Sequence, residues 1–253
     1  MTALHEQYRP RTWDDVAGQP EAVAAIRSVL ARGWGGRAWA ITGLSGQGKT
    51  TLAKLIAAEG ADPLAWREIP ARTLTPKGVE DLEEWYARRT MPINGKSGRA
   101  VFVNEYHGLR QDTLEMLLDT LERIPEHVCW LLTTTYKGQQ TFFGDDSTGD
   151  RFAAASRFQV LKLEKGPEVS LALAKRAKAV AKAAGIDGLP DSVYELAVAA
   201  CDGNLRAVLQ RVESGQLQAT ARAEVSGRLQ ALPLDGRHSA ERSRLQTLLV
   251  EIG

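Results

Sequence analysis

Eight residues with the sequence GLSGQGKT, at positions 43–50, form the clearest chemical motif in the chain. They fit the pattern G-x-x-x-x-G-K-[ST] and lie between an apolar run at 38–42 and a helical run, TLAKLIAAEG. Glycines allow backbone N–H groups to turn towards phosphate oxygens, and a helix N-terminus favours an anion. Lys49 would then reach the outer phosphates of a nucleotide, and the Thr50 hydroxyl would hold Mg²⁺. The residues that we expect to contact the nucleotide here are Gly46, Gln47, Gly48, Lys49, Thr50 and Thr51.

A second polar motif follows the apolar run at 101–103, where the chain continues with Asn104 and Glu105. In a P-loop nucleoside triphosphatase, an Asp at this strand end orders Mg²⁺, and a following Glu can polarise the attacking water. Glu105 occupies the position of the water-activating carboxylate, whereas Asn104 replaces the Asp. An amide oxygen can accept a hydrogen bond from a metal-bound water but brings no negative charge to the ion. We therefore expect a metal site at Thr50 and Asn104, retained ATP binding, and a hydrolysis rate that depends on Asn104.

Short apolar runs alternate with helical patterns through the first two-thirds of the chain, which predicts a parallel α/β sheet. The helix expected around Thr113–Arg123 carries leucines on one face, as a core-facing helix requires. The five expected strands are Ala38–Thr42, Leu64–Ile69, Ala100–Asn104, Val128–Thr134 and Phe158–Leu163. The predicted fold class is therefore α/β, with a five-stranded parallel sheet that carries both motifs at strand ends.

The strand pattern stops after about Lys165, and glycines then separate three expected helices. These helices are Pro167–Ala184, Pro190–Ala200 and Asn204–Ser214. From about Gly215, one or two further amphipathic segments are interrupted near Pro233 and Gly236. We predict a P-loop core at 1–164, a small all-helical domain at 165–214 and a short helical C-terminal segment at 215–253.

The composition is that of an ordinary globular chain of 253 residues. Its formal net charge is +1, so any contact with nucleic acid must come from a local patch. Cys129 and Cys201 are the only cysteines, too few for a four-cysteine zinc site. The N-terminus has no apolar signal-peptide run, and no stretch approaches the ~18 apolar residues of a membrane helix. We therefore expect a soluble cytoplasmic protein without a membrane segment.

Five segments in family order resemble the AAA+ ATPases of the DNA-polymerase clamp-loader family, including bacterial motor subunits and replication factor C small subunits. Residues 8–19, YRPRTWDDVAGQ, resemble the opening of these ATPases, and residues 117–128 resemble the segment between the acidic strand and sensor 1. Residues 133–135 stand at the sensor 1 position. Ser156-Arg157-Phe158 is similar to the family's Ser-Arg-Cys, and residues 203–206, GNLR, are similar to the sensor 2 motif.

The resemblance implies a role for each matching residue. Thr135 would monitor the γ-phosphate, Arg206 would do so from a helical lid, and Arg157 would be the arginine finger offered to a neighbouring subunit. Glu105, Lys49 and Arg157 would be the catalytic residues of an ATPase that uses ATP and Mg²⁺ in a homo- or hetero-oligomer. The segment that lies over the adenine in the family contains Tyr8, Arg9, Pro10 and Val16.

The chain departs from the family pattern at four places. Asn104 is the first, and the second is the absence of cysteines between the phosphate-loop helix and the next strand. The third is a longer stretch at 139–155, and the fourth is a C-terminus of 39 residues after Ser214, too short for a full helical collar. A phage, plasmid or other divergent member of the class would fit these departures.

The resemblance also implies partners, namely DNA and a sliding clamp. The basic residues on or beside the segment that faces the central channel in the family are Arg72, Lys77, Arg88 and Arg89. A solvated loop is the competing explanation for these residues. The leading functional hypothesis is an ATP-driven switch that grips DNA, a clamp or both. Two alternatives stay open: a nucleotide-binding scaffold subunit with little hydrolysis, and an ATPase of recombination or of a mobile element that loads no clamp.

Overall fold

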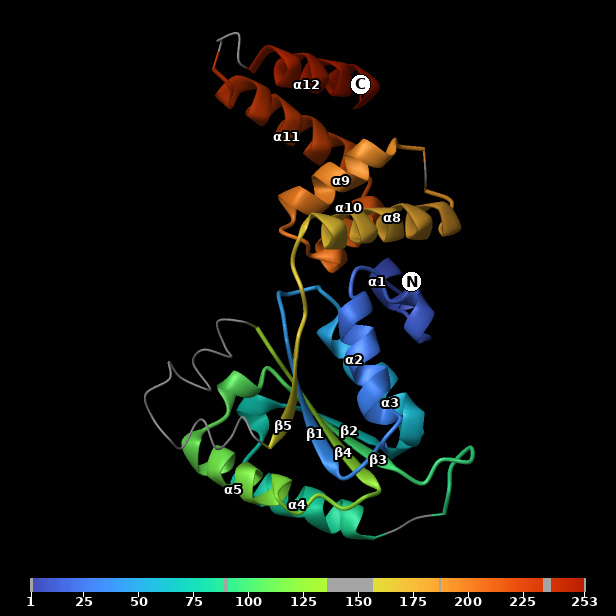
Figure 1. Ribbon diagram of the computed structural model, residues 1–253, viewed down its shortest axis with the longest axis vertical. Helices are drawn as coiled ribbons and strands as arrows, with labels where there is room; N and C mark the ends of the chain where they lie inside the picture. The colour runs from blue at the N-terminus through green and yellow to red at the C-terminus, as the bar shows by residue number, and fades with distance from the viewer. Residues whose placement is uncertain (1, 89–90, 136–156, 187, 234–237, 253) are drawn as a thin grey trace. The chain divides into compact units, whose positions relative to one another are not determined.

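The computed structural model describes residues 2–88, 91–135, 157–186, 188–233 and 238–252, which fall into two compact units (Figure 1). One unit consists of Arg11–Trp13 and Pro20–Leu163 and contains the sheet. The other consists of Met1–Pro10, Asp14–Gln19 and Glu164–Gly253 and is helical. No helix in the described part of the chain has the length and apolar character needed to cross a bilayer.

The sheet has five parallel strands in the order β2-β3-β4-β1-β5. The strands are β1 (Arg37–Thr42), β2 (Trp66–Pro70), β3 (Arg99–Asn104), β4 (Val128–Thr134) and β5 (Phe158–Lys162). Almost every residue of β1, β3 and β4 is buried, as in parallel sheets covered on both faces. The prediction of a five-stranded parallel α/β sheet is therefore confirmed.

The start of the second strand differs from the prediction. Residues Pro63–Ala65 form the short 3₁₀ helix η2, and β2 begins only at Trp66. The Asp62 carboxylate accepts a hydrogen bond from the backbone N–H of Leu64 at 3.0 Å, which satisfies the start of the turn. That bond and one from the Asn94 amide lower the pKa of Asp62. A local side-chain cap therefore replaces strand structure at Leu64.

Helices cover both faces of the sheet, as Figure 1 shows. Two of them, α4 (Pro76–Ala87) and α5 (Gln111–Leu121), share a buried cluster with one face of the sheet, which includes Trp130 and Val103. On the other face, α3 (Lys49–Gly60) packs against β1, β3 and β4, and α2 (Pro20–Leu30) lies beside it. The leucine stripe predicted for α5 is confirmed, since Leu117 and Leu121 are buried in the first cluster. The remaining short turns are η1 (Trp13–Asp15), η3 (Ala71–Thr73) and η4 (Tyr106–Gly108).

The helical unit confirms the three helices expected after residue 165 and resolves the C-terminal segment into two more. Its helices are α1 (Leu4–Gln7), α8 (Pro167–Ala183), α9 (Asp191–Ala200), α10 (Leu205–Glu213), α11 (Leu217–Ala231) and α12 (Ser239–Ile252). Glycines with positive φ, Gly185 and Gly215, follow the ends of α8 and α10, where a left-handed residue stops a helix. Asn204 caps α10, since its Oδ1 accepts from the backbone N–H of Ala207 at 3.1 Å.

One hydrophobic core joins all parts of the helical unit. It contains Leu4 of α1, Val193 of α9, Val225 of α11 and Ile252 of α12. The Gln19 side chain is buried and bonds both backbone groups of Glu164, at 3.1 and 2.9 Å. The predicted boundaries 1–164, 165–214 and 215–253 therefore do not coincide with the two units. Most of residues 1–19 and the C-terminal helices share the apolar core of the helical unit.

Candidate functional site

The ends of three parallel strands bring the sequence motifs to one edge of the sheet. In the strand register, Thr42 of β1 lies opposite Thr134 of β4, and Asn104 of β3 lies opposite Thr133 of β4. The phosphate-loop motif, Asn104 with Glu105, and Thr134 with Thr135 therefore all follow from the carboxyl ends of β1, β3 and β4. In open α/β sheets, ligands bind at this edge, where strand order changes direction.

The loop at 43–50 has the backbone of a phosphate cradle. Gly46 and Gly48 have φ of 75° and 97°, a left-handed backbone conformation that is unfavourable for residues with a side chain. A Cβ built on Gly48 would meet nothing within 4 Å, so the space beside the loop is open there. A Cβ on Gly43 would lie 2.9 Å from Gln47 Oε1 and 3.0 Å from Leu163 Cβ, so a larger residue there would displace the Gln47 side chain. The helix α3 begins at Lys49, within the last two residues of this segment, and a helix N-terminus favours an anion.

Two side chains of the loop hold its shape. Lys49 is buried, and its Nζ donates to the carbonyl oxygens of Gly43 at 3.1 Å and Leu44 at 2.8 Å. Gln47 Oε1 accepts from the backbone N–H of Leu44 at 2.7 Å. The ammonium group therefore lies against the start of the loop, and Thr50, partly buried, follows it in the first turn of α3.

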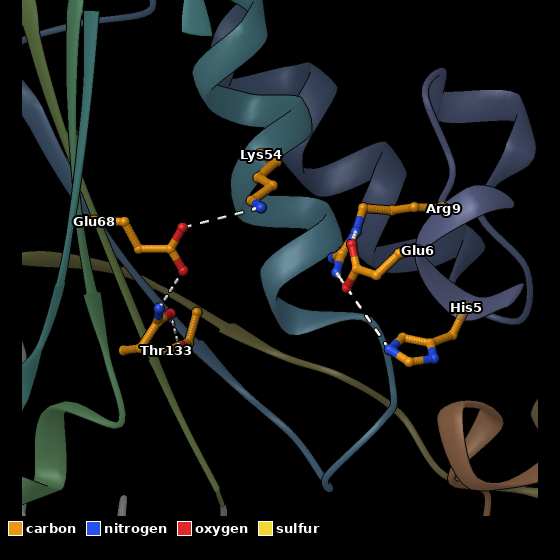
Figure 2. Close-up of polar contacts among 7 residues, drawn as sticks. His5, Glu6, Arg9, Lys54, Glu68 and Thr133 are labelled. Carbon is orange, nitrogen blue, oxygen red and sulfur yellow. Dashed lines mark hydrogen bonds and ion pairs between the residues drawn. The ribbon is translucent and has the colours of Figure 1, made fainter. Parts of the chain in front are cut away.

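Asn104 is held between its two neighbouring strands by Glu68 and Thr133, which are labelled in Figure 2. Its Nδ2 donates to Glu68 Oε1 on β2 at 2.6 Å, and its Oδ1 accepts from Thr133 Oγ1 on β4 at 3.1 Å. Glu68 Oε2 in turn lies 4.0 Å from Lys54 Nζ on α3. A carboxylate of the adjacent strand therefore accompanies the neutral amide that replaces the expected Asp.

Glu105 occupies a left-handed backbone conformation, with φ 55° and ψ 52°, which is uncommon for a residue with a side chain. The turn η4 that follows is anchored by Tyr106, which is fully buried, and burial raises the pKa of its phenol. Glu105 Oε2 lies 3.4 Å from His107 Nδ1, and the same nitrogen forms a 2.7 Å hydrogen bond with Thr134 Oγ1. The candidate water-activating carboxylate is therefore exposed at the edge of the sheet and lies near a histidine bonded to β4.

Arg157 lies at the opposite end of the sheet from the phosphate loop. It directly precedes β5, in which Phe158 is opposite Ala38, whereas the loop follows Thr42, opposite Lys162. Four strand residues correspond to about 13 Å along the sheet. The guanidinium donates from Nε to Glu122 Oε1 at 3.0 Å. The structure does not bring Arg157 to the phosphate loop of its own chain.

The remaining residues predicted to contact nucleotide lie in the helical unit. Tyr8 packs against the core of that unit, and its carbonyl accepts from Arg176 at 3.1 Å. Arg9 donates from Nε to Glu6 Oε2 at 3.1 Å, an ion pair drawn in Figure 2. Arg206 is exposed in the first turn of α10. Pro10 and Val16 are partly buried in the same unit, and the adenine and sensor 2 roles of these residues stay predictions.

The basic residues predicted to contact DNA differ in their exposure and in the charges around them. Lys77 lies in the first turn of α4, and its Nζ is 3.0 Å from Asp81 and 3.5 Å from Glu80. Arg72 and Arg88 are exposed. Acidic neighbours neutralise the charge of Lys77, so it should attract DNA phosphates less strongly than Arg72 or Arg88. Arg89, Ser156 and the predicted insertion at 139–155 lie outside the described residues.

The residues at the sheet edge fit a magnesium nucleotide better than a metal held by the protein alone. Within the described ranges, no group of three or more His, Cys, Asp or Glu side chains could hold a metal ion. Mg²⁺ is commonly bound by one or two protein groups, waters and substrate phosphates. A glycine cradle, the Thr50 hydroxyl and the Asn104 amide beside Glu68 provide that kind of partial set.

Sequence reasoning missed two residues of this edge. Glu68 was overlooked because it lies on another strand, and only the register of β2 against β3 brings it to Asn104. His107 had one available signal, its position two residues after Glu105. Both residues are polar side chains at a strand end, which is the signal that could have identified them.

Comparison with known proteins gives relatives in DNA replication. The replication factor C small subunit of Natronomonas pharaonis is 27% identical over 268 residues, covering 98% of this chain and 77% of that protein. DNA polymerase III subunit gamma of Buchnera aphidicola subsp. Baizongia pistaciae is 30% identical over 155 residues, covering 52% of this chain and 41% of that protein. DNA polymerase III subunit tau of Escherichia coli is 31% identical, with 52% and 24% covered. No protein-family model matches the chain.

Among solved structures, the RuvB Holliday junction branch migration motor of Thermotoga maritima is similar, with a TM-score of 0.56 and 21% identity. The match covers 81% of this chain and 64% of that one, so the chain spans less than two-thirds of this structural neighbour. A likeness at this identity shows the fold alone, a parallel α/β core with a helical part.

Proposed function

We propose that this chain, whose relatives are AAA+ clamp-loader subunits, is an ATP-driven switch subunit that acts on DNA with a sliding clamp. The observation that carries the proposal is the meeting of three motifs at the carboxyl ends of β1, β3 and β4. A glycine cradle, a metal-ordering amide with a carboxylate, and a threonine that follows β4 are the parts that ATP chemistry requires.

Each group at the edge has a distinct task in this proposal. Backbone N–H groups of the loop and Lys49 bind the phosphates, while the Thr50 hydroxyl and Asn104 hold the metal and its waters. Mg²⁺, when bound, would offset negative charge on the phosphate oxygens. Glu105 orients the attacking water and accepts its proton. Thr135 responds to the terminal phosphate from the end of β4, and Arg206 keeps the sensor 2 role that the resemblance implies.

Arg157 completes the site of a neighbouring subunit rather than its own. Its place at the amino-terminal edge of β5 separates it from the phosphate loop of the same chain by the length of the sheet. Its guanidinium is always charged and planar, which suits a γ-phosphate. The proposal therefore requires a homo- or hetero-oligomer, in which ATP binding joins subunits and hydrolysis releases them.

The test is steady-state ATP hydrolysis with and without primed DNA and a sliding clamp. We expect hydrolysis that rises when primed DNA and the clamp are both present. Binding to a clamp without hydrolysis, together with tight ATP binding, would favour the scaffold subunit instead, and Asn104 is the residue that motivates this alternative. Hydrolysis with no response to any clamp would favour the motor of recombination or of a mobile element.

A further inference from the structure

We propose that Glu68 is a positioning residue that fixes the orientation of the Asn104 amide and supplies the negative charge that this position lacks. This inference rests on the proposed function, because it concerns the metal side of the same nucleotide site. Glu68 lies outside both sequence motifs, near the carboxyl end of β2. It contacts Asn104 directly, and it contacts neither the phosphate loop nor Glu105 through any bond found in the described residues.

The hydrogen bonds of Asn104 permit only one orientation of the amide. A carboxylate is an acceptor without a donor, so the amide group that faces Glu68 must be Nδ2, which lies 2.6 Å from Oε1. Oδ1 then faces β4 and accepts from Thr133 Oγ1 at 3.1 Å. Rotating the amide by half a turn would place Oδ1 against the Glu68 carboxylate. Glu68 therefore determines which side of Asn104 can serve a metal-bound water.

The register of the sheet explains why these two side chains meet. Pro70 of β2 lies opposite Asn104 of β3, and Glu68 is two residues earlier on β2. Residues two apart share a face of a strand, so Glu68 and Asn104 are diagonal neighbours on the same face. Lys54 of α3 reaches this face as well, with its Nζ 4.0 Å from Glu68 Oε2 (Figure 2). The carboxylate thus links the phosphate-loop helix to the ends of β3 and β4.

The contact between Glu68 and Asn104 changes the expected effect of placing an Asp at position 104. In Asn104→Asp, a second carboxylate would replace the amide that now donates to Glu68. Two like charges at hydrogen-bonding distance disfavour each other's ionised form. The substitution therefore adds charge at the site and also breaks its best hydrogen bond. We infer that residues 68 and 104 act as one unit, in which only one of the two carries a charge.

A double-mutant cycle with two measurements tests whether Glu68 and Asn104 are coupled. The proteins are the natural chain, Glu68→Gln, Asn104→Asp and the double variant, with Glu21→Gln on the exposed start of α2 as the matched control. The first measurement is the thermal unfolding midpoint without nucleotide. We expect Asn104→Asp to lower it by about 2–4 °C, as a loss of about 1 kcal/mol does in a chain of this size, and Glu68→Gln to restore it in the double variant.

The second measurement is the Mg²⁺ concentration that half-saturates ATP binding. We expect this Mg²⁺ concentration to be several-fold higher in Glu68→Gln than in the natural chain. In the double variant it should return to the natural value, and in Glu21→Gln it should be unchanged. Additive effects of the two substitutions in both measurements would overturn the inference. Coupled unfolding midpoints with an unchanged Mg²⁺ requirement would show a purely structural pair and would overturn the positioning role. If the natural chain bound no Mg·ATP at all, the proposed function would fail, and the unfolding cycle alone would then decide whether the two residues are coupled.

Discussion

Arg157 donates from Nε to Glu122 Oε1 at 3.0 Å, so the proposed arginine finger is paired within its own chain. The side chains are 23% and 54% exposed, respectively. Exposed ion pairs of this kind contribute only about 0.2–1 kcal/mol. The γ-phosphate of a neighbouring subunit carries more charge than one carboxylate, so it can take the guanidinium from Glu122 when subunits assemble.

Arg157→Ala should abolish most ATP hydrolysis and leave ATP binding intact. Arginine fingers contribute factors of about 10³–10⁵ in well-studied enzymes of this chemistry. Steady-state hydrolysis and equilibrium ATP binding, measured on the same preparation, separate the two effects. Glu122→Gln is the matched control, because it releases the arginine without removing it, and it should hydrolyse ATP at least as fast as the natural chain.

Mixing Arg157→Ala with Glu105→Gln should restore part of the lost hydrolysis. Each variant lacks one half of a shared site, so some mixed interfaces combine an intact Glu105 with an intact Arg157. The activity of the natural chain should also rise with protein concentration. A mixture that co-assembles but stays inactive, or full activity in a strict monomer, would show that Arg157 serves no neighbouring site.

His107→Phe should slow hydrolysis while ATP affinity stays within about twofold of natural. The histidine contacts both Glu105 and Thr134, so its loss frees the carboxylate without touching the phosphate loop. A partly exposed contact such as the 3.4 Å pair of His107 and Glu105 contributes about 0.2–1 kcal/mol, which corresponds to a change in rate of about fivefold at most. His107→Asn retains a hydrogen-bonding group, so its hydrolysis rate should lie between those of the natural chain and His107→Phe. A Phe variant with a natural kcat would contradict a role for His107 in positioning Glu105.

Gly60→Ala should destabilise the sheet unit by about 1–3 kcal/mol, the usual effect of overpacking. A Cβ at this position would lie 2.1 Å from Cδ2 of Trp34, whose ring is held by a 2.6 Å hydrogen bond from Nε1 to the Ile56 carbonyl. Denaturant unfolding measures the change. Gly227→Ala in α11 is the control, because a Cβ there meets nothing within 4 Å and replacing a helical glycine gains up to about 1 kcal/mol. Equal stability of Gly60→Ala and the natural chain would contradict this packing.

The centre of the sheet could be predicted because β1, β3 and β4 are nearly continuous apolar runs that end in polar residues. Asn104 was identified from the end of such a run, whereas Thr135 was assigned from the family resemblance, and parallel strands place both residues at the same edge of the sheet. The grouping of Leu4 and Tyr8 with the helical unit could not be predicted in the same way. These residues belong to no long periodic pattern, and their apolar partners lie more than a hundred residues later in the chain.

The contact between Glu68 and Asn104 could not be predicted from sequence motifs either. It depends on the alignment of β2 with β3, in which Pro70 rather than Glu68 is opposite Asn104. The start of β2 was itself predicted two residues too early, because the Asp62 cap holds Leu64 in a turn. Without the start and register of β2, no spacing in the sequence identifies the diagonal partner of Asn104.

Calorimetric titration with ATP in the presence of Mg²⁺, on the natural chain and on Lys49→Ala, tests the central claim most directly. Lys49 is buried in the loop, and its ammonium lies against the carbonyls of Gly43 and Leu44, beside the proposed phosphate cradle. We predict that the natural chain binds Mg·ATP and that Lys49→Ala, compared at a temperature at which both proteins are folded, loses most or all of this binding. Equal affinity in the two proteins would show that the loop at 43–50 is not the nucleotide site.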